Sequence, residues 1–290
     1  MRATKTATVF FVALSSMSAQ QLYAQCRVPK TSNEAKLLAF YSAPIAFSPA
    51  SAPENSIPWT IRIGGEGGPL PSPDSAIRQS SICHTKKSEN TDLSSFFGRP
   101  RITLTLPAGF ALEASYLPPI QIGDATPNLG SAAVSWMRRI RMAPTGNATA
   151  IMLRLHGTAG HVRGPITCPR SALQQSDPNG SCYGTQQSTD EFKPAMMGIE
   201  GMLSTAAWDG RLAFYAGGGE NFLRPRFQVG FIDSSGNVDR TLIVVDLNRA
   251  TMFAGVTAEV SNAIDLSAQA YGVHQDGVTF RFGGGYRLYR

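Results

Sequence analysis

The chain has 290 residues, of which only 16% are charged, and it carries 28 glycines and 19 prolines. This composition favours many strands and turns and argues against a helical protein. The formal net charge is +6 at neutral pH, but the basic residues are scattered singly along alternating segments. We therefore expect no nucleic acid as a partner.

The first residues show the three parts of a secretory signal peptide. Arg2 and Lys5 precede an apolar run from Val9 to Leu14, and small residues follow near Ala24. The apolar run is far shorter than the roughly 20 residues that a membrane-spanning helix needs. We predict cleavage after Ala24, which makes residues 1–24 a signal peptide and the mature protein an exported one.

Residues 25–56 show no alternating pattern of useful length. A short stretch with helical signals is followed by the prolines Pro44, Pro49, Pro53 and Pro58. We interpret this segment as an N-terminal part that precedes the strands. It is either an extension on the periplasmic side or a plug folded into the lumen of the strand domain, and the sequence leaves both alternatives open.

Twelve segments then alternate between apolar and polar residues, with the period of two that is typical of strands. The first is Trp59 to Gly64, and the last is Val278 to Leu288, where Phe280 and Phe282 oppose Arg281. An apolar face opposite arginines and glycines is expected where one side meets lipid and the other a wet lumen. We predict an all-β fold over residues 57–290, a transmembrane antiparallel up-and-down β-barrel of about 12 strands, with 10 to 14 as the range.

The lengths of the connections support this prediction. If the last strand ends in the periplasm, short periplasmic turns alternate with longer outer loops. The three longest connections, near residues 67–98, 117–130 and 161–193, then all lie outside. The short ones fall on the periplasmic side: Pro107 to Gly109, Ala143 to Ala148, Ala206 to Gly210, Ser234 to Arg240, and Ser261-Asn262.

The four cysteines of an exported chain are expected to pair. Cys168 and Cys182 bracket one Pro/Ser/Asn/Gly-rich segment and form the natural local disulfide. Cys83 falls in an outer loop, so a bridge to Cys26 requires the N-terminal segment to cross the lumen. Otherwise both cysteines stay unpaired, or the first strand is misplaced. No Cys-x-x-Cys or His-rich spacing indicates zinc, so we predict no metal site and no cofactor.

The polar faces of the strands supply candidate lumen-lining residues. Mixed charges inside a barrel either line an aqueous path or pair with each other and fill it. A barrel of this size lies between filled eight-stranded barrels and open porins, and we favour filling. The charged candidates are Arg62, Arg101, Glu113, Arg154, Glu200, Glu259, Asp265, Arg281 and Arg287.

The run from Arg99 to Asn128, RPRITLTLPAGFALEASYLPPIQIGDATPN, resembles a stretch of outer-membrane β-barrels of the long-chain fatty-acid transporter type. It is also similar to an uncharacterised family of predicted bacterial outer-membrane barrels, through its leucine-proline-x-glycine turn and its tyrosine-x-proline-proline end. The resemblance implies a barrel in outer-membrane lipid that binds or passes a small molecule, a hydrophobic one or a lipid included. The last strand looks like the signal that the barrel-assembly machinery reads, but Tyr289 is penultimate and Arg290 extends beyond it.

No hydrolase, metal or phosphate motif stands out, and no His-x-Ser pair matches the arrangement of twelve-stranded outer-membrane phospholipases. We predict no catalytic residues and no enzymatic activity. The leading hypothesis is an integral outer-membrane barrel of a Gram-negative-type bacterium, a channel or transporter for a small solute or hydrophobic molecule. The alternatives are a non-transporting surface barrel with disulfide-clipped outer loops and a soluble secreted β-barrel whose apolar faces form a core.

Overall fold

The structure is a computed structural model of the 290-residue chain. It describes residues 25–53, 57–83, 93–142, 148–208 and 210–288. The predicted signal peptide, residues 1–24, lies outside the described residues. No helix in the described part of the chain is long and apolar enough to cross a membrane.

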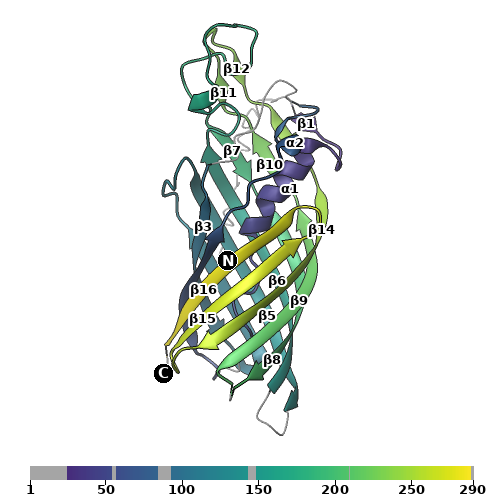
Figure 1. Cartoon of the computed structure of the whole chain (residues 1–290), viewed down its shortest axis with the longest axis vertical. Coiled ribbons are helices and arrows are strands. Elements are labelled where there is room, and N and C mark those ends of the chain that lie inside the picture. Colours follow the sequence, from purple (N-terminus) through teal and green to yellow (C-terminus); the bar gives the residue numbers. More distant parts are fainter. Residues whose placement is uncertain (1–24, 54–56, 84–92, 143–147, 209, 289–290) are drawn as a thin grey trace, which may run out of the picture.

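Ten antiparallel strands close into a barrel (Figure 1). Successive strands pair with each other, and β16 pairs with β2 to close the cylinder, with Leu288 opposite Ile61 and Phe282 opposite Gly67. The predicted fold class is confirmed, and ten strands fall within the expected range. The barrel strands are β2 (Ile61–Pro69), β3 (Phe96–Thr105), β4 (Phe110–Leu117), β5 (Thr126–Met142), β6 (Ala148–Gly164), β8 (Met196–Ala207), β9 (Leu212–Leu223), β14 (Leu247–Glu259), β15 (Ile264–Val273) and β16 (Gly277–Leu288).

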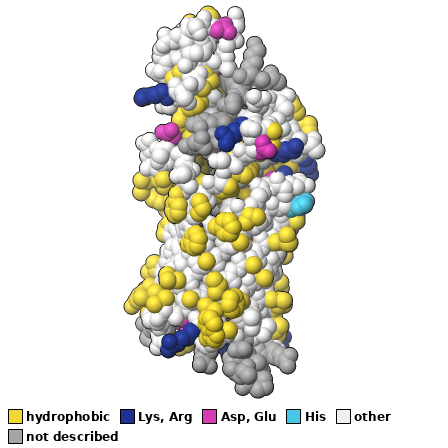
Figure 2. All heavy atoms as spheres, in the orientation of Figure 1, with side chains coloured by type: hydrophobic (Ala, Val, Ile, Leu, Met, Phe, Trp, Pro, Cys, Tyr) yellow, Lys and Arg dark blue, Asp and Glu magenta, His cyan; other side chains and the backbone are white. Residues whose placement is uncertain are grey.

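The two faces of the barrel wall differ sharply in polarity. Phe282 and Leu155 point outward and are 60% and 54% exposed, whereas their neighbours Arg281 and Arg154 are 5% and 1% exposed. On the face of the molecule that Figure 2 shows, apolar side chains are spread over the outer surface of the cylinder, and charged side chains lie towards its two ends. A barrel that buries its arginines and exposes its phenylalanines is inverted relative to a soluble barrel, and this is the arrangement of a transmembrane one.

The two ends of the barrel differ in the length of their connections. The short-turn end carries the 3₁₀ turn Pro107–Gly109 and the connection at residues 260–263. The long-loop end carries residues 70–83, 93–95, 118–125, 165–195 and 224–246. Of the connections predicted to be short turns on one side, Ser234 to Arg240 is misplaced, because it lies at the long-loop end. Residues 143–147 of the predicted turn Ala143 to Ala148 lie outside the described residues.

A small sheet continues the barrel wall at the long-loop end (Figure 1). Its strands, in order from the end of β6, are β7 (Asp190–Lys193), β10 (Arg226–Gln228), β13 (Leu242–Val244) and β1 (Gln25–Arg27). Pro194 lies between β7 and β8, and Pro225 lies between β9 and β10. Each interrupts its strand because proline has no N–H group to donate to the hydrogen-bond ladder of a sheet. A hairpin of β11 (Phe231–Ile232) and β12 (Val238–Asp239) stands beside it.

The predicted strand segments Arg226 to Ile232 and Thr241 to Leu247 therefore do not cross the barrel. They contribute β10, β11 and β13, while Leu247 begins β14. An alternating pattern records that one face of a strand is buried, and it does not distinguish lipid from water on the other face.

The N-terminal segment runs through the lumen. After β1, Ser32 caps helix α1 (Asn33–Ile45), accepting a hydrogen bond from the Ala35 N–H at 3.1 Å. The chain continues as an extended stretch towards the short-turn end, where the Ala52 N–H donates to the Thr257 hydroxyl at 2.8 Å, and then enters β2. We call residues 33–53 the lumen segment.

Two further short helices lie in the loops at the long-loop end. Helix α2 (Ser75–Arg78) belongs to the β2–β3 loop, and Asn33 of α1 donates hydrogen bonds to the Ala76 and Gln79 carbonyls at 3.0 Å each. The 3₁₀ turn Arg170–Ala172 belongs to the loop before β7. The first loop is thereby docked onto the N-terminal end of α1.

Candidate functional site in the closed lumen

The C-terminal end of α1 is held by arginines of the barrel wall. The last four carbonyls of a helix have no partner within the helix, and the negative end of its dipole attracts cations. The last turn of α1 contains no basic residue of its own. Every carbonyl oxygen from Ala43 to Ser48 instead accepts a hydrogen bond from an arginine of β3, β6 or β16.

We call Arg99, Arg101, Arg154 and Arg281 the arginine cluster. The hydrogen bonds run from Arg281 to Ala43 (3.0 Å), Pro44 (3.3 Å) and Ala46 (3.0 Å), from Arg99 to Ile45 (2.9 Å) and Ala46 (2.8 Å), from Arg154 to Phe47 (2.6 Å), and from Arg101 to Ser48 (2.9 Å). The next carbonyl, that of Pro49, accepts from Gln269 at 2.8 Å.

Phe47 fills the space among three of these guanidinium groups. Its side chain is fully buried, and its ring centre lies 4.1 Å from Arg101, 4.7 Å from Arg99 and 5.0 Å from Arg154. A cation over an aromatic face is attracted to it, and the attraction grows when water is excluded. Phe47 therefore adds a side-chain anchor to the row of carbonyl contacts.

Carboxylates link the guanidinium groups to one another. Glu66 pairs with Arg99 and with Arg101, the latter at 2.6 Å. Glu113 pairs with Arg101 at 2.5 Å and with Arg154 at 3.1 Å. Buried charges persist when they are paired and hydrogen-bonded in this way. The result is a charged layer across the lumen at the level of residues 43–48.

Glu200 is less engaged than the other two carboxylates. It lies 3.9 Å from Arg154 and 3.4 Å from His156, and its side chain is almost fully buried. Neither of its carboxylate oxygens accepts a hydrogen bond from the described residues.

A second ionic group lies nearer the short-turn end. Asp265 accepts hydrogen bonds from two nitrogens of the Arg62 guanidinium group. Arg287 lies 3.6 Å from Asp265 and 3.0 Å from Glu259. Arg62 reaches Asp265 across Gly285, where a Cβ atom would come within 2.3 Å of its guanidinium carbon.

The structure thus places all nine predicted lumen residues on the inner face of the barrel, seven of them with almost fully buried side chains and Glu113 and Glu259 with 14% and 41% exposure. Sequence reasoning missed Glu66 and Arg99, which pair on neighbouring strands β2 and β3. It interpreted the glycine-rich stretch from residue 67 as a loop, although the alternation of Arg62, Gly64 and Glu66 continues the strand. It also gave no role to Phe47 or to Glu34.

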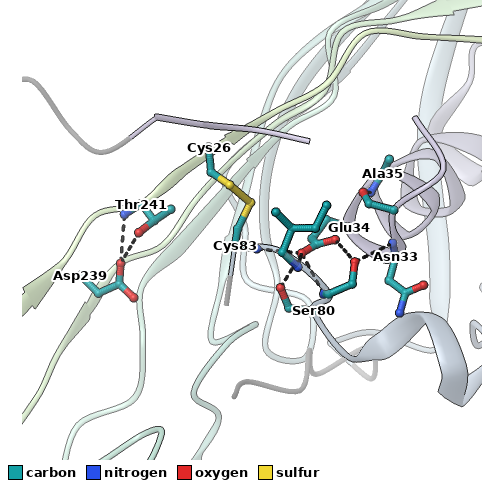
Figure 3. Close-up of a disulfide and its surroundings, with 11 residues drawn as sticks. Cys26, Asn33, Glu34, Ala35, Ser80, Cys83, Asp239 and Thr241 are labelled. Atoms are coloured by element: carbon teal, nitrogen blue, oxygen red, sulfur yellow. Dashed lines mark hydrogen bonds between the residues drawn. A yellow bond between two sulfur atoms is a disulfide. The ribbon is translucent and has the colours of Figure 1, made fainter. Parts of the chain in front are cut away.

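Glu34 fastens the other end of α1 to the β2–β3 loop (Figure 3). Its carboxylate accepts hydrogen bonds from the Ser80 hydroxyl (2.7 Å), the Ser81 hydroxyl (2.8 Å), and the backbone N–H groups of Ser81 (2.9 Å), Ile82 (2.7 Å) and Cys83 (3.0 Å). Burial alone would raise the pKa of Glu34, but these hydrogen bonds outweigh burial and lower the pKa to about 2.

Two disulfides reinforce the long-loop end. Cys83 is bonded to Cys26, so the start of the N-terminal segment is joined to the same loop that Glu34 holds (Figure 3). Cys168 is bonded to Cys182 within the loop between β6 and β7. No group of three or more His, Cys, Asp and Glu side chains within the described ranges is arranged to hold a metal ion.

Cavities lie on both sides of the charged layer. At the long-loop end, an apolar pocket of about 150 Å³ lies between α1 and the wall and is lined by residues such as Leu37, Tyr41, Phe97, Leu129, Val162 and Phe192. At the short-turn end, a cavity of about 420 Å³ is lined by Pro53, Thr60, Arg62, Glu113 and Met152, among others. The apolar pocket extends as far as Ile45, and the cavity at the short-turn end begins at Pro49, so residues 46–48 separate the two.

No family model matches the sequence, and no curated protein matches it. Among solved structures, the outer-membrane protease OmpT of Escherichia coli is 8% identical, with a TM-score of 0.41, covering 83% of this chain and 99% of that chain. The transport unit of the autotransporter AIDA-I of Escherichia coli is 11% identical, with a TM-score of 0.39 and coverages of 89% and 99%. Ail, the attachment invasion locus protein of Yersinia pestis, is 10% identical, with a TM-score of 0.32 and coverages of 80% and 100%. A similarity to long-chain fatty-acid transporters is not shown by these comparisons.

Proposed function

We propose that this chain is an integral outer-membrane barrel of a Gram-negative-type bacterium, and that its lumen segment closes the barrel at rest. In this proposal the barrel takes up a small hydrophobic molecule at its long-loop end. The inverted polarity of the wall supports the membrane location. Short turns in such barrels face the periplasm and longer loops face outside, which supports an outward-facing apolar pocket.

The apolar pocket is the observation that carries the uptake proposal. Its aromatic lining includes Phe97 and Phe192, and its volume is about 150 Å³. A cavity of roughly this volume, lined by Leu, Ile and Phe, stays dry and binds benzene. Glu34 also borders the pocket, but its carboxylate is taken up by the β2–β3 loop. The pocket therefore suits a neutral molecule of about one aromatic ring.

Passage to the other side requires movement of the lumen segment. Residues 46–48 separate the apolar pocket from the cavity at the short-turn end. The segment is anchored at both ends, through the Cys26–Cys83 disulfide and through its continuation into β2. Transport in this proposal is a rearrangement of residues 46–48 inside the lumen, without expulsion of the segment.

A non-transporting surface barrel is the second candidate. The observation that favours it is the density of anchors at the long-loop end, where two disulfides and Glu34 fix the loops. Toluene, a neutral molecule of one aromatic ring, serves as the probe. A non-transporting barrel does not pass toluene through its lumen, whether or not the apolar pocket binds it. Liposomes that contain the purified barrel distinguish the two candidates, because only a transporter accelerates the entry of toluene into them.

Binding is tested by filling the pocket. Val162 on β6 lines it, whereas Leu155 on the same strand faces outward. In lipid nanodiscs, calorimetric titration with toluene, corrected with empty nanodiscs, should show saturable binding to the wild type and to Leu155→Trp. Binding should be lost in Val162→Trp. A wild-type protein without saturable binding would refute the proposal, and recovery from cells in the soluble fraction without detergent would refute the membrane location.

A further inference from the structure

We infer that the arginine cluster is an anion-selective constriction, and that the carbonyl oxygens of residues 43–48 occupy it while the barrel is closed. The inference goes beyond the uptake of a hydrophobic molecule and does not depend on what the apolar pocket binds. It concerns the charge of the solute that the lumen conducts once those carbonyls move away.

The cluster carries an excess of positive charge. Its four guanidinium groups face three carboxylates, those of Glu66, Glu113 and Glu200. Arg281 accounts for the excess, because among the described residues no carboxylate comes within ion-pairing distance of it. Its hydrogen bonds go to the carbonyls of Ala43, Pro44 and Ala46 and to the Ser48 hydroxyl.

A buried guanidinium without a carboxylate is costly unless other acceptors compensate it. Arg281 is 5% exposed and also lies 4.3 Å from the centre of the Tyr271 ring. Its compensation comes from carbonyl oxygens, which carry partial negative charge, and from the face of an aromatic ring. The peptide oxygens of the lumen segment therefore take the place that anionic oxygens would take.

The geometry of the donors points to the same class of ligand. Planar guanidinium forks match the oxygens of carboxylate and phosphate groups, and rings of arginine or lysine select anions in pores. The donors come from β3, β6 and β16, so they surround the lumen segment from several sides. When residues 43–48 move away, the same donors face any solute that passes between the two cavities.

Two of the three carboxylates of the layer offer no competing site for cations. Glu66 and Glu113 each bridge two arginines, so their charge is already compensated. Glu200 is less engaged, but it is almost fully buried, 3.9 Å from Arg154 and 3.4 Å from His156. An entering cation would meet these groups together with Arg281, which forms no ion pair with a carboxylate of the described residues.

The test is the reversal potential of full-length protein in planar lipid bilayers with a KCl gradient. Phe47→Ala removes the ring that Arg99, Arg101 and Arg154 surround and leaves every backbone carbonyl in place, so it should increase the time spent open. The reversal potential should shift towards that of chloride. Adding Arg281→Gln to Phe47→Ala should move it back towards zero, whereas adding Arg163→Gln, an exposed arginine at the long-loop end, should leave it unchanged.

A second route to the open state protects the test against a variant that stays closed. Wild-type protein is recorded in urea, below the concentration at which circular dichroism shows loss of the barrel, and the same chloride preference is expected. A preference for potassium by either route would overturn the inference. A preference for chloride that persists after Arg281→Gln would also overturn it, as would a barrel that conducts by neither route.

Discussion

Cys26 and Cys83 are 57 positions apart in the sequence, and their Cα atoms lie 6.1 Å apart at the long-loop end of the barrel. The chain between them goes down the lumen and returns up the wall as β2. Of the alternatives that the sequence left open, the structure selects the one in which the N-terminal segment crosses the lumen. The disulfide therefore closes a covalent ring that contains the whole lumen segment.

Removing this disulfide should loosen the lumen segment and leave the barrel folded. A disulfide typically contributes about 2 to 4 kcal/mol, and more when the loop that it closes is long. In Cys26→Ser/Cys83→Ser, trypsin should cleave after the exposed Lys36 faster than in the wild type, as measured by mass spectrometry. The matched control is Cys168→Ser/Cys182→Ser, which opens only a local loop. Equal cleavage in both double variants would contradict a role for the first disulfide in holding α1.

The hold of Glu34 on the β2–β3 loop should weaken in acid. Its folded-state pKa is lowered from 4.5 to about 2, so the stabilisation is fully present above pH 4.5 and is lost as the pH falls towards 2. Pepsin, with its rate normalised at each pH to that on an unfolded substrate, should cleave α1 faster at pH 2 than at pH 4. Glu34→Gln should show fast cleavage at both values, and a wild type without any change would refute the prediction.

The wall of the barrel could be predicted from the sequence because each strand separates two environments. Phe282 and Arg281 are neighbours with opposite surroundings, and a period of two records that difference directly. The same period of two also occurs in the small sheet at the long-loop end, so the sequence did not distinguish that sheet from the barrel wall. Phe227 alternates with its polar neighbours Arg226 and Gln228 as barrel residues do, but it lines the apolar pocket from β10, which lies beyond the barrel wall.

The path of the lumen segment could not be predicted, and the physical reason lies in its contacts. Apart from Phe47 and Ser48, the arginine cluster binds the segment through backbone carbonyls, which every residue type possesses. The sequence of residues 43–48 therefore carries little information about where the segment lies. The arginines do carry information, and three of the four, Arg101, Arg154 and Arg281, were predicted to face the lumen. Arginines on the inner face suit an open aqueous lumen as well as a closed one, however, so they do not reveal the segment.

Placing a charge on the outer face should impair insertion. Phe282 is 60% exposed on β16, in the middle of the strand. Phe282→Arg should destabilise the barrel folded in lipid vesicles by about 2 to 4 kcal/mol if the residue lies near the bilayer midplane. Urea titration in vesicles measures this difference. Phe282→Leu, which keeps an apolar side chain at the same outward position, should change the stability little, and equal losses in the two variants would undo the assignment of the faces.

Gly285 leaves the space through which Arg62 reaches Asp265, so a single methyl group there should break this ion pair. An alanine Cβ would lie 2.3 Å from the Arg62 guanidinium carbon, so the end of this side chain must move from its place beside Asp265. Losing a buried pair altogether costs about 3 to 5 kcal/mol, which sets the upper limit of the effect. Gly285→Ala should therefore be less stable than the wild type in urea titrations, whereas Gly130→Ala should be nearly neutral, because no atom lies within 4 Å of a Cβ there. Equal stability of the two variants would show that Arg62 has another way to reach its partner.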